Sequence, residues 1–117
     1  MDQFVAAYQT ALRRYTAFEG RTSVGGFWRF VAVNVAITIV LNILAGIADL
    51  FGIVAILYAL ALLIPGLAAA SRRLRDTGRS GWFQLIVLIP LIGWIILIVW
   101  LIPPSDGPNE YGQGPED

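Results

Sequence analysis

The sequence predicts an all-α membrane protein with three transmembrane helices, an N-terminal amphipathic interfacial helix and a short acidic tail. Of its 117 residues, 57% are hydrophobic and 14% are charged, whereas soluble domains carry about 25% charged residues. The apolar residues gather in runs long enough to cross a bilayer. All eight basic residues are arginines, and they lie in two segments of the chain. These observations indicate that the apolar surface needs a bilayer as its solvent.

Residues 1–26 are expected to form an amphipathic helix over 2–19, followed by a link rich in glycine, serine and threonine. The apolar side chains of this helix recur at spacings of three or four residues: Phe4, Tyr8, Leu12, Tyr15 and Phe18. We expect the helix to lie in the membrane interface, with its aromatic side toward the lipid. Packing on the cytoplasmic end of the helix bundle is the alternative.

The transmembrane domain is predicted over residues 27–102. Asp49 marks a very short turn after the first apolar run, and Pro65 is expected to kink the second run without ending it. Each run reaches roughly the 20 residues that a spanning helix needs. The three predicted spans cover about residues 27–48, 50–70 and 82–102.

Tryptophans mark the expected membrane boundaries. Trp82 and Trp100 are 18 positions apart, which is about 27 Å along a helix and matches the hydrocarbon thickness. We interpret these two residues, together with Trp28 near the start of the first span, as interfacial anchors. Two prolines then end the third span, and residues 103–117 are predicted to be a flexible tail.

The arginines predict the orientation of the protein. They precede the first predicted span, lie at its very start or lie between the second and the third, at positions 13, 14, 21, 29, 72, 73, 75 and 79. Three spans would place all of them on one side of the membrane, which the positive-inside rule makes cytoplasmic. The N-terminus is then expected inside and the acidic tail outside. The acids of the tail are Asp106, Glu110, Glu116 and Asp117.

The missing residue types argue against catalysis. The sequence has no cysteine, no histidine and no lysine. The usual thiol nucleophile, general base, zinc ligands and Schiff-base amine are therefore absent. We expect no enzyme activity, no cofactor and no metal site.

Four short pieces of the sequence, in this order, resemble a family of small bacterial inner-membrane proteins known as domain of unknown function 805. The pieces lie at residues 18–21 with 27–28, at 72–82, at 90–93 and at 109–112. Arg75 stands where that family usually has histidine, Phe83 where a second tryptophan is common, and residues 24–26 where basic residues often occur. The resemblance implies a bacterial inner membrane and supplies no activity.

The segment from Ser71 to Gly81 is predicted to be a compact polar loop between the second and third spans. Structurally, Arg72 and Arg73 can pair with Asp76 at helical spacing, while Gly78 ends one helix and Ser80 caps the next. Functionally, the arginines could hold an anionic lipid headgroup at about 1 kcal/mol each. We favour the structural role. The charged residues of the loop are Arg72, Arg73, Arg75, Asp76 and Arg79.

A polar stripe is predicted on the first span. Asn34, Thr38 and Asn42 are four positions apart and so lie on one helix face. We expect this stripe to pack against protein, inside the bundle or between protomers. A pore or substrate path lined by these side chains is the alternative.

Together these features predict a non-catalytic component of the membrane that acts through helix packing and contacts with lipids or proteins. The expected partners are membrane lipids, anionic ones among them, and a second copy or a larger membrane protein. Nucleic acid is not expected, because no extended basic face is visible. The alternative function is a small oligomeric channel or transporter.

Overall fold

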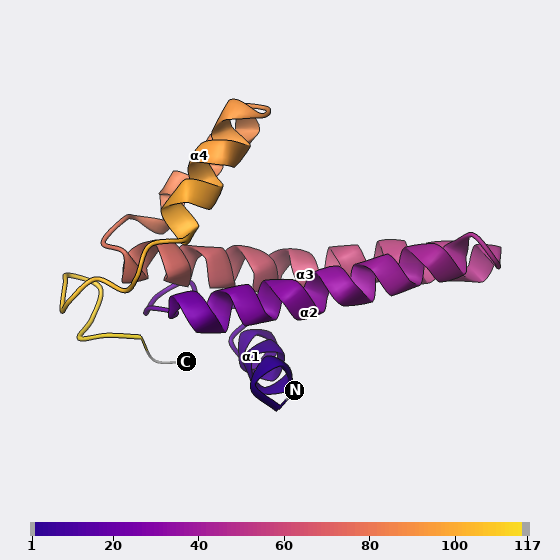
Figure 1. The fold of residues 1–117 in the computed structure, drawn as a ribbon, viewed down its shortest axis with the longest axis horizontal. Helices are drawn as coiled ribbons and strands as arrows, with labels where there is room; N and C mark the ends of the chain where they lie inside the picture. The colour runs from indigo at the N-terminus through magenta and orange to yellow at the C-terminus, as the bar shows by residue number, and fades with distance from the viewer. Residues whose placement is uncertain (1, 116–117) are drawn as a thin grey trace.

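The computed structural model describes residues 2–115, and within them the only pairing of β type is an isolated bridge between Asn109 and Gly112. Two long helices lie side by side along the long axis of the molecule (Figure 1). A short helix and a helical hairpin branch from the same half of this pair in different directions (Figure 1). The elements are α1 (Asp2–Arg13), α2 (Val24–Ala45), α3 (Asp49–Asp76), the 3-10 helix η1 (Gly81–Leu88) and α4 (Ile92–Leu101).

The α2–α3 pair confirms the first two predicted apolar helices. Ser23 caps α2 by accepting a hydrogen bond from the Gly26 amide, and α3 continues through Pro65. Both helices are long and apolar enough to cross a membrane, and in the described part of the chain they are the only two that are. The second helix runs to Asp76 instead of ending near residue 70. The predicted polar loop is therefore mostly the last turns of α3, which ends where Gly78 adopts a φ of +84°.

The prediction of one continuous helix over 82–102 is wrong. This apolar segment folds into a hairpin of η1 and α4, with a tight turn at residues 89–91. Pro90 disfavours helical geometry at the preceding residue and cannot donate a backbone hydrogen bond. Leu91 takes a φ of +63°, and Gly93 lies so close to the Ile86 carbonyl that a Cβ would not fit there.

The hairpin brings together the two tryptophans that were predicted to lie at opposite membrane surfaces. Trp82 lies in the first turn of η1 and Trp100 in the last turn of α4, and the rings of Phe83 and Trp100 are 5.5 Å apart between centroids. The two residues therefore do not lie at opposite ends of one helix, and their role as interfacial anchors stays a prediction. The ten residues of α4 extend only about 15 Å, roughly half of the hydrocarbon core.

The C-terminal tail folds back onto the end of the α2–α3 pair that carries the arginines. The Asp106 amide donates to the Asp76 carbonyl at 2.7 Å, and the Asn109 side chain donates to the Arg75 carbonyl at 3.1 Å. Residues 103–115 therefore lie at the end that carries the arginines, and the prediction of a tail at the opposite end is wrong for them. The flexibility of the tail stays a prediction. Glu116 and Asp117 lie outside the described residues.

The N-terminal helix packs on the bundle, as in the alternative interpretation of the sequence. It is shorter than expected, because it ends at Arg13. The Tyr8 ring stacks on Phe30 of α2 at 5.9 Å between centroids. Tyr15 and Phe18 fall beyond the helix and are exposed. The buried apolar cluster consists of Ala11, Phe27, Phe30, Ala69, Leu74 and Leu101.

Candidate functional site

The most unusual feature of the described residues is a group of charged side chains buried at one end of the α2–α3 pair. Arg21, Arg73 and Asp76 are 0% exposed and Arg72 is 2% exposed. Charged residues of this kind are almost never fully buried unless they are paired. We refer to these four residues as the arginine cluster.

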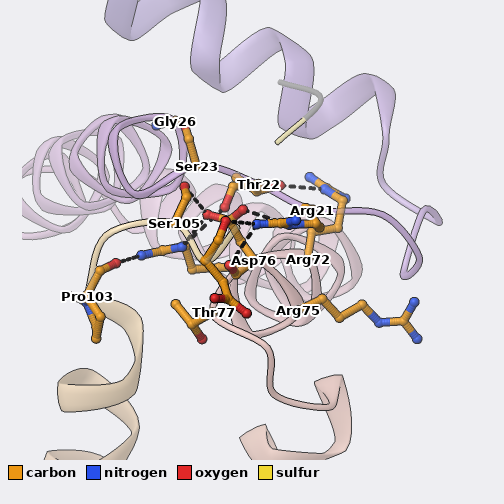
Figure 2. Close-up of polar contacts among 12 residues, drawn as sticks. Arg21, Thr22, Ser23, Gly26, Arg72, Arg75, Asp76, Thr77, Pro103 and Ser105 are labelled. Atoms are coloured by element: carbon orange, nitrogen blue, oxygen red, sulfur yellow. Dashed lines mark hydrogen bonds and ion pairs between the residues drawn. The ribbon is translucent and has the colours of Figure 1, made fainter. Parts of the chain in front are cut away.

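Asp76 occupies the centre of the cluster (Figure 2). Its Oδ1 accepts a hydrogen bond from Arg21 Nε at 2.9 Å, and its Oδ2 accepts one from Arg73 Nη1 at 2.8 Å. The Ser105 hydroxyl also donates to Oδ2. One carboxylate thus joins the link before α2, the end of α3 and the C-terminal tail.

Arg21 fixes the tail through its remaining donors. Its Nη1 donates to the carbonyls of Gly107 and Gly112 at 3.0 and 2.9 Å. Its Nη2 donates to the carbonyls of Asp76 and Asp106. The planar fork of a guanidinium suits this arrangement, because it presents five donors in fixed directions.

Arg72 and Arg73 hold two other segments. Arg72 donates to the Thr22 hydroxyl at 2.9 Å and to the carbonyls of Arg14 and Ala17 at 3.0 and 2.8 Å. These bonds fasten the link between α1 and α2. Arg73 donates to the Leu101 carbonyl at 3.0 Å and to the Pro103 carbonyl, where α4 ends.

The cluster has the chemistry of a structural junction. Among the described residues, Asp76 accepts from Arg21 and Arg73, and backbone carbonyls accept from all three arginines. Burying an ion requires such partners, because an uncompensated charge in a protein interior costs several kcal/mol. The sequence has no histidine, so no imidazole is available to take a proton from the Ser105 hydroxyl beside Asp76. The described residues also include no group of acidic side chains that could hold a metal ion.

The structure separates the predicted loop residues into two groups. The expected pairing of Arg73 with Asp76 is confirmed, whereas Arg72 bonds to Thr22 instead of Asp76. Arg75 and Arg79 are partly exposed and lie over aromatic rings. Arg75 is 5.1 Å from the centroid of Tyr111 and Arg79 is 5.7 Å from that of Trp100.

Tyr111 contributes a neutral ring beneath Arg75. Partial burial raises the pKa of its hydroxyl, and the neighbouring Glu110 adds to this rise while Arg75 opposes it. The hydroxyl therefore stays protonated at neutral pH. Among the described residues, Arg75 Nε is buried and has no hydrogen-bond partner, and its guanidinium lies over the Tyr111 ring.

Sequence reasoning missed the central role of Arg21. Its partners lie 55 to 91 positions away along the chain, so no local spacing reveals them. The signal lay in the short pieces that resemble the family. The pieces at 18–21, 72–82 and 109–112 meet around Arg21 and Asp76, and the piece at 90–93 forms the tip of the hairpin.

The polar stripe faces protein only at its first residue. Asn34 Oδ1 accepts a hydrogen bond from Tyr58 of α3 at 2.8 Å, and the Tyr58 hydroxyl contacts that of Tyr8 at 2.7 Å. Thr38 and Asn42 are exposed and donate to carbonyls of their own helix at 2.8 and 2.7 Å. Within one chain, the packing prediction therefore holds for Asn34 and not for the other two.

The tryptophans that were predicted as interfacial anchors differ in their burial. Trp28 is partly buried, and its indole N–H donates to the Leu101 carbonyl at 3.0 Å. It thus joins α2 to the end of α4. Trp82 is 77% exposed, which leaves its ring available to a membrane interface.

These features define an all-helical protein with two helices that could cross a membrane and a buried arginine cluster at one end of the pair. The chain belongs to the family described as Protein of unknown function (DUF805), which matches residues 15–113. This match confirms the resemblance found in the sequence.

Two relatives illustrate the similarity. The inner membrane protein YhaI of Escherichia coli (strain K12) is 36% identical over 111 residues, covering 93% of this chain and 94% of YhaI. The inner membrane protein YhaH of the same strain is 36% identical over 115 residues, covering 93% of this chain and 95% of YhaH. No solved structure matches the chain.

Proposed function

We propose that the protein is a non-catalytic component of the bacterial inner membrane. The α2–α3 pair would span the bilayer, and the end of this pair would form a rigid cap that contacts anionic lipids and a second copy or another membrane protein. The observation that carries this proposal is the arginine cluster. The charged groups of the cluster form hydrogen bonds and ion pairs within the chain. This suits a permanent scaffold better than a site that exchanges substrates.

The proposal includes an orientation. The eight arginines belong to segments at one end of the α2–α3 pair or just inside it, so the positive-inside rule favours a cytoplasmic location for this end. Because the tail packs against Arg21, the C-terminus would be cytoplasmic as well. The η1–α4 hairpin would enter the membrane from that side and return to it.

A small oligomeric channel is the second candidate function. The exposed side chains of Thr38 and Asn42 favour it, because a polar face on a spanning helix is disfavoured against lipid. Several copies could bring these faces together, either as a dry interface or as the lining of a path.

Reconstitution separates the two functions. Liposomes that contain the purified protein should pass ions and small solutes no faster than protein-free liposomes. Cross-linking in native membranes should recover the chain with a specific second protein or with itself. A flux that Asn42→Leu abolishes and Val40→Leu preserves would overturn the scaffold proposal. Val40 is the control because it lies on the same helix and is 54% exposed.

A further inference from the structure

A cavity of about 280 Å³ lies between α1, the start of α2 and the last turns of α3. It borders the arginine cluster, since Arg72 and its partner Thr22 form part of its wall, and it does not include Arg21, Arg73 or Asp76. None of the described residues that line it is acidic. The polar residues that line it are Gln3, Thr10, Thr22, Ser23, Arg29 and Arg72. Of these, Arg72, Thr22 and Ser23 are engaged in hydrogen bonds within the chain, so Arg29 is the cationic side chain that the cavity offers to a ligand.

Arg29 is the residue that points to a ligand. It lies in the second turn of α2, and its side chain has no hydrogen-bond or ion-pair partner among residues 2–115. Arg21 and Arg73, by contrast, are bonded to Asp76. An arginine inside an apolar helix is costly unless it reaches water, a headgroup or an anion.

The direction of the Arg29 side chain fits this requirement. Its Nη1 lies so close to Gly25 that a Cβ on that glycine would be 3.1 Å away. The guanidinium is thus folded back toward the N-terminal end of α2. In a spanning helix this is the direction of the membrane surface, where lipid phosphates lie. The amide groups at the start of α2 add a partial positive charge there.

We propose that this cavity binds a phosphate group, with Arg29 as its principal ligand. The phosphate belongs to an anionic phospholipid or to a soluble phosphate, since both present the same oxygen acceptors. Forked guanidinium donors match these oxygens. A volume of about 280 Å³ exceeds several times the roughly 30 Å³ of a water molecule, so a phosphate group fits. The lipid form of this inference rests on the lipid contacts of the proposed function.

The test compares binding by the full chain in detergent. Native mass spectrometry would measure the retention of phosphatidylglycerol and of zwitterionic phosphatidylcholine, and a thermal-shift titration would measure inorganic phosphate. Arg29→Gln should weaken phosphate-group binding roughly tenfold or more, because a charge-assisted hydrogen bond is lost. Arg29→Lys should give an intermediate loss, since the charge remains without the fork. Arg79→Gln is the matched control, because Arg79 lies over Trp100 outside the cavity.

The outcomes are distinct. Selective loss in Arg29→Gln supports the site; an effect on phosphatidylglycerol alone assigns it to lipid, and an effect on inorganic phosphate assigns it to a soluble anion. Equal weakening by Arg29→Gln and Arg79→Gln overturns the cavity site while leaving the proposed lipid contacts intact. If the unmodified protein shows no preference for phosphatidylglycerol and no phosphate binding, the site and the lipid contacts both fail.

Discussion

Replacing Asp76 by asparagine is expected to destabilise the folded protein by about 3–5 kcal/mol, the range for removing one partner of a buried ion pair. Asp76 is the one carboxylate of the arginine cluster, and both of its oxygens accept hydrogen bonds from buried guanidinium groups. Asparagine preserves the shape of the side chain and removes its charge. Arg21 and Arg73 would then lose the buried carboxylate that both of them contact.

Glu19→Gln is the matched control for this change. It also removes one negative charge, but Glu19 is exposed, so the free energy of unfolding should change by no more than about 0.5 kcal/mol. Chemical unfolding of the purified protein in mild detergent would measure both variants. Similar stability in the two would show that Asp76 does not hold the cluster together.

The second large effect is expected at the tip of the hairpin. Gly93→Ala should destabilise the protein by about 1–3 kcal/mol, the usual range for overpacking. The added Cβ would collide with the Ile86 carbonyl and push η1 away from α4. The sign of the effect is informative, because alanine in a continuous helix stabilises it by up to about 1 kcal/mol relative to glycine.

Gly66→Ala is the matched control, because it shows how alanine changes the stability at a glycine inside a continuous helix. Gly66 lies inside α3 with nothing within 4 Å of an added Cβ, so alanine should be neutral or stabilising there. Thermal unfolding in detergent, followed by circular dichroism, would compare the two variants. If both glycine substitutions stabilise the protein, residues 82–102 form a single helix and the hairpin is incorrect.

Composition and hydropathy were sufficient to predict the α2–α3 pair, because each helix is a long apolar segment that ends at turn residues. They could not predict the hairpin. A run of about 20 apolar residues has the same hydropathy whether it crosses the membrane once or turns back. Only Pro90 and Gly93 distinguish a hairpin from a single spanning helix in this segment. Prolines also occur within membrane helices, as Pro65 does in α3.

The candidate site was predicted in part. The position of Asp76 three residues after Arg73 identified one ion pair correctly. The bonds of Arg21 to Asp76 and to the carbonyls of Gly107 and Gly112 depend on how distant segments pack. Backbone acceptors carry no sequence signature, so the tail's attachment to the cluster emerges only in three dimensions.

The central claim of this account is that both ends of the chain lie on the same side of the membrane. Because the protein has no cysteine, single substitutions can report the side of each exposed position. Gln9→Cys lies on α1, Ile47→Cys in the turn between α2 and α3, and Gln113→Cys in the tail, and all three positions are exposed. The reagent is a membrane-impermeant maleimide, applied to intact spheroplasts and to lysed membranes.

Ile47→Cys should react in intact spheroplasts, whereas Gln9→Cys and Gln113→Cys should react only after lysis. This pattern follows from two spanning helices and a hairpin that returns to the cytoplasmic side. Labelling of Gln113→Cys in intact spheroplasts to the same extent as Ile47→Cys would place the tail outside. That result would contradict the account, because the tail could not then be bonded to Arg21 beside Asp76.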